Sequence, residues 1–411
     1  MGLNTVLLDL HDDAALLEVN LVALGAASGL LWRSPTLTLA GLGDVTEVPL
    51  GLRSADALDS ELKARRGSDE VRVPGSGPIA FAALPFDREA TGTAQLPDII
   101  LGEVDGQRFL TAPDALSVGD VEEMVKVVLD GVGIESVPKM RISSRRPASA
   151  WRDDVVGTAR DHLVATGMGK AVLARQLTLV AEGSFPVARI VRDLDRRFPE
   201  AMVFAIDGFI GASPELLVGR SDRSVRAHPL AGTAGRSSDP DIDRAAIDEL
   251  RGSVKDRTEH QITIDWLLAE LLPFCSYVDA EPEPSVVSMV NVHHLGTLVE
   301  GVLSAPPVSV VDLAAAVHPT PALGGEPQEL ALQLIRELEG FDRGRYGGPA
   351  GWVDGDGNGE FAVSVRTASI EDDSAVVCAG VGVVAQSDPE AELLETQAKF
   401  RAMLGSLLNP A

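Results

Sequence analysis

The sequence predicts an α+β protein in which packed antiparallel β-sheets are flanked by helices within a single domain, residues 1–411. Up to about residue 138, short strand-like pieces alternate with polar loops. From about residue 150, strands and helices come in blocks, which favours antiparallel sheets over the regular βαβ alternation of parallel ones. A basic connector with Pro and Ser, residues 137–149, lies between the two parts, but no second composition regime follows it. We therefore expect an N-terminal sheet portion, 1–150, and a second portion, 151–411, in one domain.

The N-terminal portion is predicted mainly as strands. Runs rich in apolar residues and bounded by turn-forming residues are typical of strands. They cover residues 37–43, 79–86, 98–104 and 107–112. Residues 53–78 mix charged, Gly and Pro residues, so we expect an exposed helix and loop there.

The second portion begins with a helix over 153–166, a strand over 171–180 and a helix over 186–197. Strands follow within 202–232, and an amphipathic stretch predicts one long helix over about 241–272. Helices over 309–318 and 327–338, a hairpin over 348–370, a strand over 374–384 and a helix from about residue 389 complete the order. The turn "DGDGNG" begins like a calcium loop, but Val365 stands where the bidentate glutamate belongs, so we interpret it as a hairpin turn.

The amino-acid composition narrows the classes of function that this protein can have. The net charge is −26 and the pI about 4.6, which disfavours nucleic acid and anionic membrane surfaces as partners. Two cysteines are too few for a disulfide framework or a zinc cluster. The N-terminus has no basic segment before its apolar run and is not typical of a signal peptide. We expect a cytoplasmic protein that binds a small molecule, as a monomer or homodimer.

Two pairs of acids stand on predicted helices. Asp256 and Glu259 are spaced i, i+3, as are Glu392 and Glu395, so each pair lies on one side of its helix. In so acidic a chain, either pair alone is typical of a solvated face. If the pairs face each other, their oxygens predict a site for a hard cation such as Mg²⁺. Lys399 follows Glu395 by one turn and would add a positive charge beside that site.

Lys170 stands directly before the buried strand that begins "AVLA". Read alone, it is typical of a lysine whose stem lies on the sheet and whose ammonium stays in water. A second interpretation is a lysine whose ammonium points into a functional site. That interpretation needs support from elsewhere in the chain.

That support comes from seven motifs. In order they read "HPLAGTAGR", "KDRTEH", "HPTPALGG", "RYGGPAGW", "SVRTASI", "AGVGVV" and "ELLETQAK". In order and approximate spacing the sequence resembles the chorismate-utilising enzymes, which include isochorismate synthase, salicylate synthase and the large subunit of anthranilate synthase. The resemblance is strong over residues 150–411, and before residue 150 it is limited to the general pattern of the sequence. It implies the chorismate-utilising-enzyme fold and a Mg²⁺-bound chorismate site.

The resemblance also implies roles for individual residues. Lys170 matches the general base of members that add water to chorismate, and Glu215 in "ASPELLVGR" matches the general acid. Glu259 and Glu395 match the Mg²⁺ ligands, with Asp256 and Glu392 completing the set directly or through water. The substrate-binding positions implied by the motifs are Gly232, Thr233, His318, Ala322, Leu323, Tyr346, Arg366, Gly382 and Lys399.

The implied reaction is the Mg²⁺-dependent conversion of chorismate to isochorismate, an isomerisation in which water adds at C2 and the C4 hydroxyl leaves. Lys170 argues against the ammonia-using anthranilate synthases. Ala231 occupies the place of the lysine nucleophile of covalent aminodeoxychorismate synthases. The alternative is salicylate synthase, and the least favoured is an inactive chorismate-binding protein. Whether the product feeds menaquinone, a siderophore or salicylate stays open, as does the role of Arg236.

Overall fold

A computed structural model describes residues 2–9, 13–132, 137–290 and 292–410. Its strands are β1 (Leu3–Leu7), β2 (Leu30–Arg33), β3 (Leu37–Gly51), β4 (Arg66–Asp69), β5 (Ile79–Ala83), β6 (Thr91–Val104), β7 (Gln107–Pro113), β8 (Met140–Ser144), β9 (Lys170–Ala181), β10 (Met202–Ile206), β11 (Phe209–Ser213), β12 (Leu216–Ser221), β13 (Ser224–His228), β14 (Leu230–Gly235), β15 (Cys275–Ala280), β16 (Ser285–Ser288), β17 (Val292–Gly296), β18 (Val299–Leu303), β19 (Gly325–Glu326), β20 (Pro349–Asp354), β21 (Gly359–Val363), β22 (Thr367–Glu371) and β23 (Ser374–Val383).

The helices are α1 (Ala14–Leu17), α2 (Leu21–Ser28), α3 (Asp56–Ala64), α4 (Val118–Asp130), α5 (Ala148–Ala150), the π-helix η1 (Trp151–Gly157), α6 (Thr158–Thr166), α7 (Val187–Arg197), α8 (Pro240–Gly252), α9 (Val254–Leu271), the 3₁₀-helix η2 (Leu272–Phe274), α10 (Val310–Ala316), α11 (Gln328–Glu339) and α12 (Pro389–Leu408).

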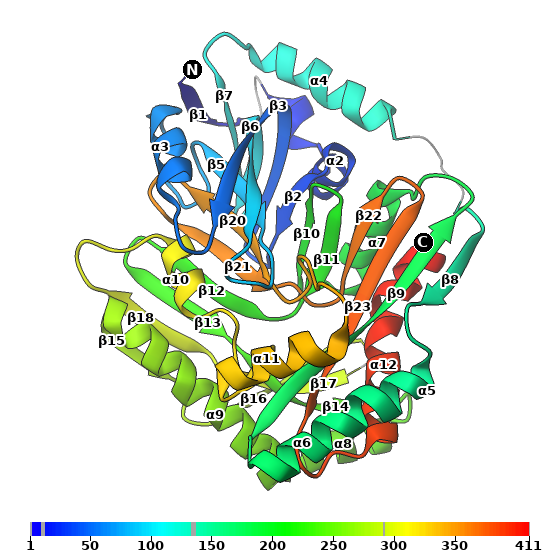
Figure 1. Cartoon of the computed structure of the whole chain (residues 1–411). Coiled ribbons are helices and arrows are strands. Elements are labelled where there is room, and N and C mark those ends of the chain that lie inside the picture. The colour runs from blue at the N-terminus through cyan, green and yellow to red at the C-terminus, as the bar shows by residue number, and fades with distance from the viewer. Residues whose placement is uncertain (1, 10–12, 133–136, 291, 411) are drawn as a thin grey trace.

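The strands form two long antiparallel paths. One runs β15–β18–β13–β12–β21–β20–β5–β6. The other runs β3–β2–β10–β11–β22–β23–β9–β8, and the pairing of β3 with β6 joins the two. β1 pairs in parallel with β4, and β14, β17 and β16 form a small separate sheet. In Figure 1 the N-terminal strands gather at the top and α6, α8 and α9 at the bottom. The predicted α+β class with antiparallel sheets is confirmed.

Large aromatic side chains fill the space between the two paths. Trp32 and Phe204 come from the second path, and Phe81 and Trp352 from the first; all four are fully buried. Apolar alternation along these strands sends these side chains to one face, as strand geometry requires. The outer faces pack on helices, with α7 and α12 on the second path and α9 and α10 on the first. The helices that carry the acid pairs are thus fixed to the sheets by their apolar faces.

Two local predictions were wrong. The expected long helix over 241–272 is two helices, because Ser253 adopts extended backbone angles and caps α9 by accepting a hydrogen bond from the Asp256 N–H at 3.1 Å. The expected connector contains β8, whose residues pair with β9 from Leu177 to Ala181. An edge strand exposed on most positions carries no apolar alternation, so its sequence resembles a loop.

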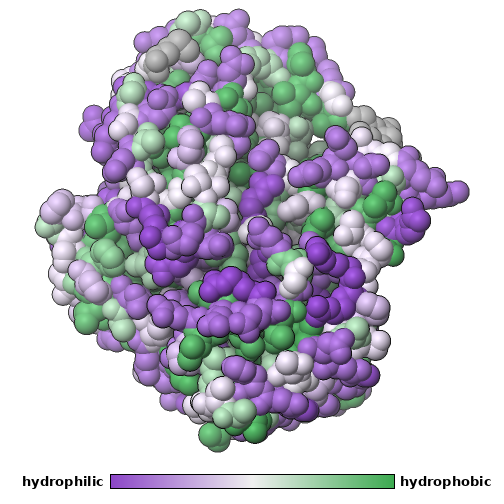
Figure 2. Space-filling model, in the orientation of Figure 1, coloured by the Kyte–Doolittle hydropathy of each residue, from purple (hydrophilic) through white to green (hydrophobic). Residues whose placement is uncertain are grey.

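The face of the molecule shown in Figure 2 is largely polar. On the face in Figure 2, hydrophilic residues predominate and hydrophobic ones lie in small separate patches. Among the residues that the structure describes, no helix combines the length and apolar character that crossing a bilayer requires.

Candidate active site

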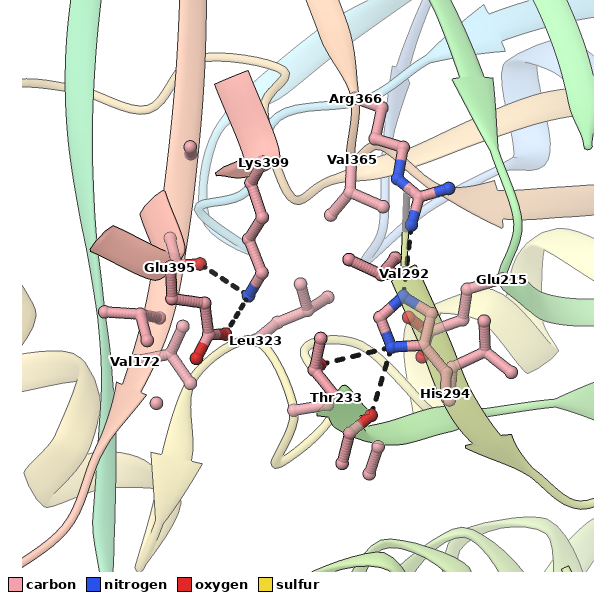
Figure 3. A pocket seen from close by; sticks show the side chains of 18 of the residues that line it. Val172, Glu215, Thr233, Val292, His294, Leu323, Val365, Arg366, Glu395 and Lys399 are labelled. Carbon is pink, nitrogen blue, oxygen red and sulfur yellow. Dashed lines mark hydrogen bonds and ion pairs between the residues drawn. The ribbon is translucent and has the colours of Figure 1, made fainter. Parts of the chain in front are cut away.

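One cavity of about 390 Å³ collects nearly all of the predicted site residues. It lies where β9, β14, β17, β23, α9 and α12 meet the loops before β19 and β22. The predicted residues that line it are Lys170, Glu215, Gly232, Thr233, Asp256, Glu259, Ala322, Leu323, Tyr346, Arg366, Gly382, Glu392, Glu395 and Lys399. Figure 3 shows Glu395 and Lys399 on one side, opposite Thr233, His294 and Arg366. Segments that are far apart in sequence therefore form one polar site.

Lys170 is the first residue of β9, and its side chain crosses the neighbouring strand β23. Lys170 Nζ forms an ion pair with Glu259 Oε1 of α9. A Cβ atom added at Gly382 would lie 2.4 Å from Lys170 Cε, too close for any real contact. Because glycine has no side chain, position 382 leaves the space through which the Lys170 side chain reaches the cavity.

Glu215 lies in the short link between β11 and β12 and is 7% exposed. Burial raises the pKa of its carboxyl from 4.5 to about 7, against the opposing effects of a hydrogen bond from the Leu230 backbone and of the charges on Lys170, Arg366 and Lys399. Its Oε1 is buried and makes no hydrogen bond with the described residues. Desolvation favours the neutral form of a carboxyl, so this group can hold a proton near neutral pH.

The four acids of α9 and α12 line the cavity, but each α9 acid and Glu395 contacts a partner within the chain. Glu259 pairs with Lys170, Glu395 Oε1 lies 2.8 Å from Lys399 Nζ, and Asp256 Oδ2 accepts a hydrogen bond from Ser253. The described residues contain no group of three or more His, Cys, Asp or Glu side chains placed to hold a metal ion. The donor set suits a hard cation, because it consists of carboxylate oxygens. Binding one would require these side chains to turn from their present partners.

Arg366, which falls within the predicted hairpin over 348–370, lies in the link between β21 and β22 and not within a strand. Its φ is +56°, a left-handed conformation that few non-glycine residues adopt. Nη2 donates to His294 Nε2 at 3.1 Å, while Nη1 is buried and has no hydrogen-bond partner among the described residues. Burial lowers the pKa of Arg366 to about 10, so the guanidinium remains charged at neutral pH. Such a donor can bind a ligand carboxylate.

The sequence reasoning missed His294 of β17, a polar residue that lines the cavity. Its Nδ1 lies 3.1 Å from the Gly232 carbonyl, which can only accept, so Nδ1 carries the proton and Nε2 accepts from Arg366. Nδ1 is also 3.2 Å from Thr233 Oγ1. Burial, then the charge of Arg366, lowers the pKa of His294 to about 3, which keeps the ring neutral. The sequence signal that could have indicated His294 is the pair "HH" within a buried strand. A histidine in a buried strand is, however, more typical of the core than of a site.

Gly232, Tyr346 and Lys399 complete the wall. Gly232 has φ +70°, and a Cβ atom there would meet Asp256 Cβ at 3.1 Å, so glycine permits both the turn and the close approach of α9. Lys399 Nζ donates to the Gly380 carbonyl at 2.9 Å. Burial raises the pKa of the Tyr346 hydroxyl, which therefore stays protonated.

His318 and Arg236 lie outside the cavity. His318 is fully buried behind the loop 320–325, and its Nε2 donates to the Phe86 carbonyl at 2.9 Å. The structure thus does not bring His318 to the predicted substrate site, because its ring turns inward to satisfy a buried backbone oxygen. Arg236 donates to the Met289 carbonyl at 3.0 Å and pairs with Asp243 at 3.4 Å, which ties β14 to α8.

Comparisons with known proteins show which proteins this chain is similar to. The family model described as "Chorismate binding enzyme" matches residues 21–408. The isochorismate synthase MenF of Bacillus subtilis is 33% identical over 361 residues, covering 82% of this chain and 76% of that protein. The isochorismate synthase DhbC of the same organism is 41% identical over 251 residues, covering 58% and 63%. The structure of MenF, the menaquinone-specific isochorismate synthase from Escherichia coli, aligns with a TM-score of 0.80 over 99% of this chain and 94% of that one, at 23% identity.

Proposed function

Because the chain belongs to the chorismate-binding enzyme family, we propose that it is an isochorismate synthase, an isomerase that converts chorismate to isochorismate. The observation that carries this proposal is that a lysine and a glutamate with a raised pKa line the same cavity. A pure binding protein needs neither a base nor a protonated acid. Adding water at one ring carbon and expelling hydroxide at another needs both.

In the proposed reaction, Lys170 takes a proton from the water that attacks C2. The two ring double bonds shift, and Glu215 gives its proton to the C4 hydroxyl, which leaves as water. Lysine accepts a proton only as the neutral amine, so the Lys170 ammonium, which pairs with the Glu259 carboxylate, must first release a proton to solvent. Positioned acid and base groups of this kind each contribute about 10²–10⁴-fold to the rate.

Chorismate is a dianion, so each of its carboxylates needs a positive partner. We assign the enolpyruvyl carboxylate to Arg366, whose buried Nη1 is available for it. His294 supports this assignment, because it accepts from Nη2 and so orients the guanidinium. Glu259 and Glu395 would hold a Mg²⁺ ion, with Asp256 and Glu392 completing the ligand set directly or through water, and this ion would supply the positive charge for the ring carboxylate. When bound, the ion would neutralise the acids and attract the substrate anion.

The accumulating product is proposed to be isochorismate and not salicylate. Ala322 and Leu323 give the cavity a small apolar wall, which offers the intermediate no polar contact to retain it for pyruvate elimination. Purified protein incubated with chorismate and Mg²⁺ near neutral pH should yield isochorismate by chromatography, with little salicylate or pyruvate. Stoichiometric pyruvate and salicylate would instead identify a salicylate synthase, and no turnover at all would identify a binding protein.

A further inference from the structure

The strand β9, which begins with Lys170, has a gap along one edge. On its other edge β23 pairs with it from Ala171 to Val180. On the gapped edge, β19 pairs with residues 170 and 171, and β8 pairs with residues 177 to 181. The described chain places no strand against residues 172–176 on that edge. Buried backbone groups in such a gap need other hydrogen-bond partners.

Two side chains of a buried ion pair fill this gap. Glu339, the last residue of α11, accepts a hydrogen bond from the Ala174 N–H through Oε1 at 2.6 Å. Arg343 donates to the Val172 carbonyl through Nη2 at 2.7 Å. The two side chains bind each other through Arg343 Nε and Glu339 Oε2 at 2.9 Å, and they are only 3% and 1% exposed. With the Val172 N–H, which donates to the Gly324 carbonyl, and Trp151 Nε1, which donates to the Ala174 carbonyl, they supply hydrogen bonds that a neighbouring strand would make.

Arg343 also reaches the loop that forms the apolar wall of the cavity. Its Nη1 donates to the Leu323 carbonyl at 3.1 Å. Its Cζ lies 4.3 Å from the centre of the Phe86 ring, whose edge-to-face neighbour is His318, two residues before the loop 320–325. One guanidinium thus joins the main chains of Val172 and Leu323, and both of these residues line the cavity. Figure 3 shows their two side chains on the side of Glu395.

Stability alone does not account for such a pair. Replacing a buried ion pair by apolar residues of similar size is often neutral or stabilising. A planar guanidinium with several fixed donors is, however, well suited to hold two carbonyls at a set separation. Neither Glu339 nor Arg343 lines the cavity, so any effect on the substrate must pass through the residues that they hold.

We propose that Glu339 and Arg343 form a positioning unit that sets the separation of Val172 and Leu323 and thereby the fit of the substrate ring. The inference rests on the proposed function for the identity of the substrate, chorismate. It adds two residues from outside the cavity to the determinants of substrate affinity.

Three variants separate positioning from stability. Arg343→Met leaves Glu339 as a buried charge without its partner, so a large loss of Tm is expected. In the double variant Glu339→Gln with Arg343→Met, neither charge remains and the new amide oxygen still accepts from the Ala174 N–H, so much of the Tm should return. The carbonyls of Val172 and Leu323 still lack donors, so the KM for chorismate should stay raised at least fivefold. Arg343→Lys keeps the positive charge but lacks the planar group that donates to both carbonyls, so it should raise the KM by an intermediate factor.

The control is a second ion pair with a buried acid, Asp193→Asn with Arg197→Gln on α7, which should leave the KM unchanged. Hydrogen exchange without substrate should be faster in segments 170–177 and 320–326 of the double variant Glu339→Gln with Arg343→Met and unchanged in β11 and β22. A wild-type KM in both this double variant and Arg343→Lys would overturn the proposal, and so would unchanged exchange. If the wild type does not turn over chorismate, the proposed function fails, and the exchange measurement still tests the positioning unit.

Discussion

Replacing Glu215 with glutamine tests both the buried acid and its role. Glutamine keeps the size of the side chain but can neither ionise nor donate a carboxyl proton. The pKa of Glu215 is raised from 4.5 to about 7 by burial, and at about 1.4 kcal/mol per pKa unit this corresponds to about 3 kcal/mol between the two protonation states. The folded protein therefore binds this proton more tightly than the unfolded chain does.

The sign of the pH effect follows from that difference. Below about pH 4.5 the carboxyl is neutral in both the folded and the unfolded state, so ionisation has no effect on stability. As the pH rises from 4.5 to 7, the unfolded chain ionises first, and the folded wild type loses up to about 3 kcal/mol of stability. Glu215→Gln is free of this loss. The free energy of unfolding of the variant minus that of the wild type should therefore increase by about 3 kcal/mol between about pH 4.5 and about pH 8.

Urea denaturation of both proteins at several pH values measures this difference, and contributions from titrating groups that do not interact with Glu215 cancel in the comparison. In turnover assays, Glu215→Gln should lower kcat by about 10²–10⁴-fold. The wild type should hold about tenfold less of the protonated acid at pH 8 than at pH 6. A stability difference that does not change with pH would refute the buried-acid assignment, and a variant with kcat within tenfold of the wild type would refute the catalytic one.

Lys170→Ala should lower kcat by about 10²–10⁴-fold while chorismate still binds, because a base acts in the transition state. Calorimetric measurement of chorismate binding, together with turnover assays, checks this. A variant with more than a few per cent of wild-type kcat would restore the interpretation of Lys170 as a solvated lysine. Glu259→Gln or Glu395→Gln should abolish turnover and weaken Mg²⁺ binding with an unchanged circular dichroism spectrum; near-wild-type activity at sub-millimolar Mg²⁺ would contradict the ligand assignment. Gly382→Ala should lower kcat at least tenfold by displacing the Lys170 stem, whereas Gly235→Ala, where an added Cβ meets nothing within 4 Å, should not; equal activities would contradict the packing argument.

Local sequence patterns determined the class of fold, and the resemblance of the motifs implied most of the residues that line the cavity. Alternation and turn residues predicted the strands, and the i, i+3 spacing predicted that Glu392 and Glu395 share one side of α12. The order of the motifs, through resemblance, implied that Lys170 and Glu215 belong to one site. The structure brings both residues to the same cavity. Their chemical roles stay predictions.

Tertiary structure decided which groups meet across the sequence. His294 and Arg366 are 72 residues apart, and Lys170 and Glu259 are 89 apart, so no periodicity within a strand or helix could pair them. His318 stands in a motif beside Leu323, yet its ring turns inward to the Phe86 carbonyl while Leu323 faces the cavity. Hydrogen-bond partners and burial depend on the whole packed chain. The sequence therefore determined which side chains are available for the site, and packing alone decided their partners, their burial and hence their pKa values.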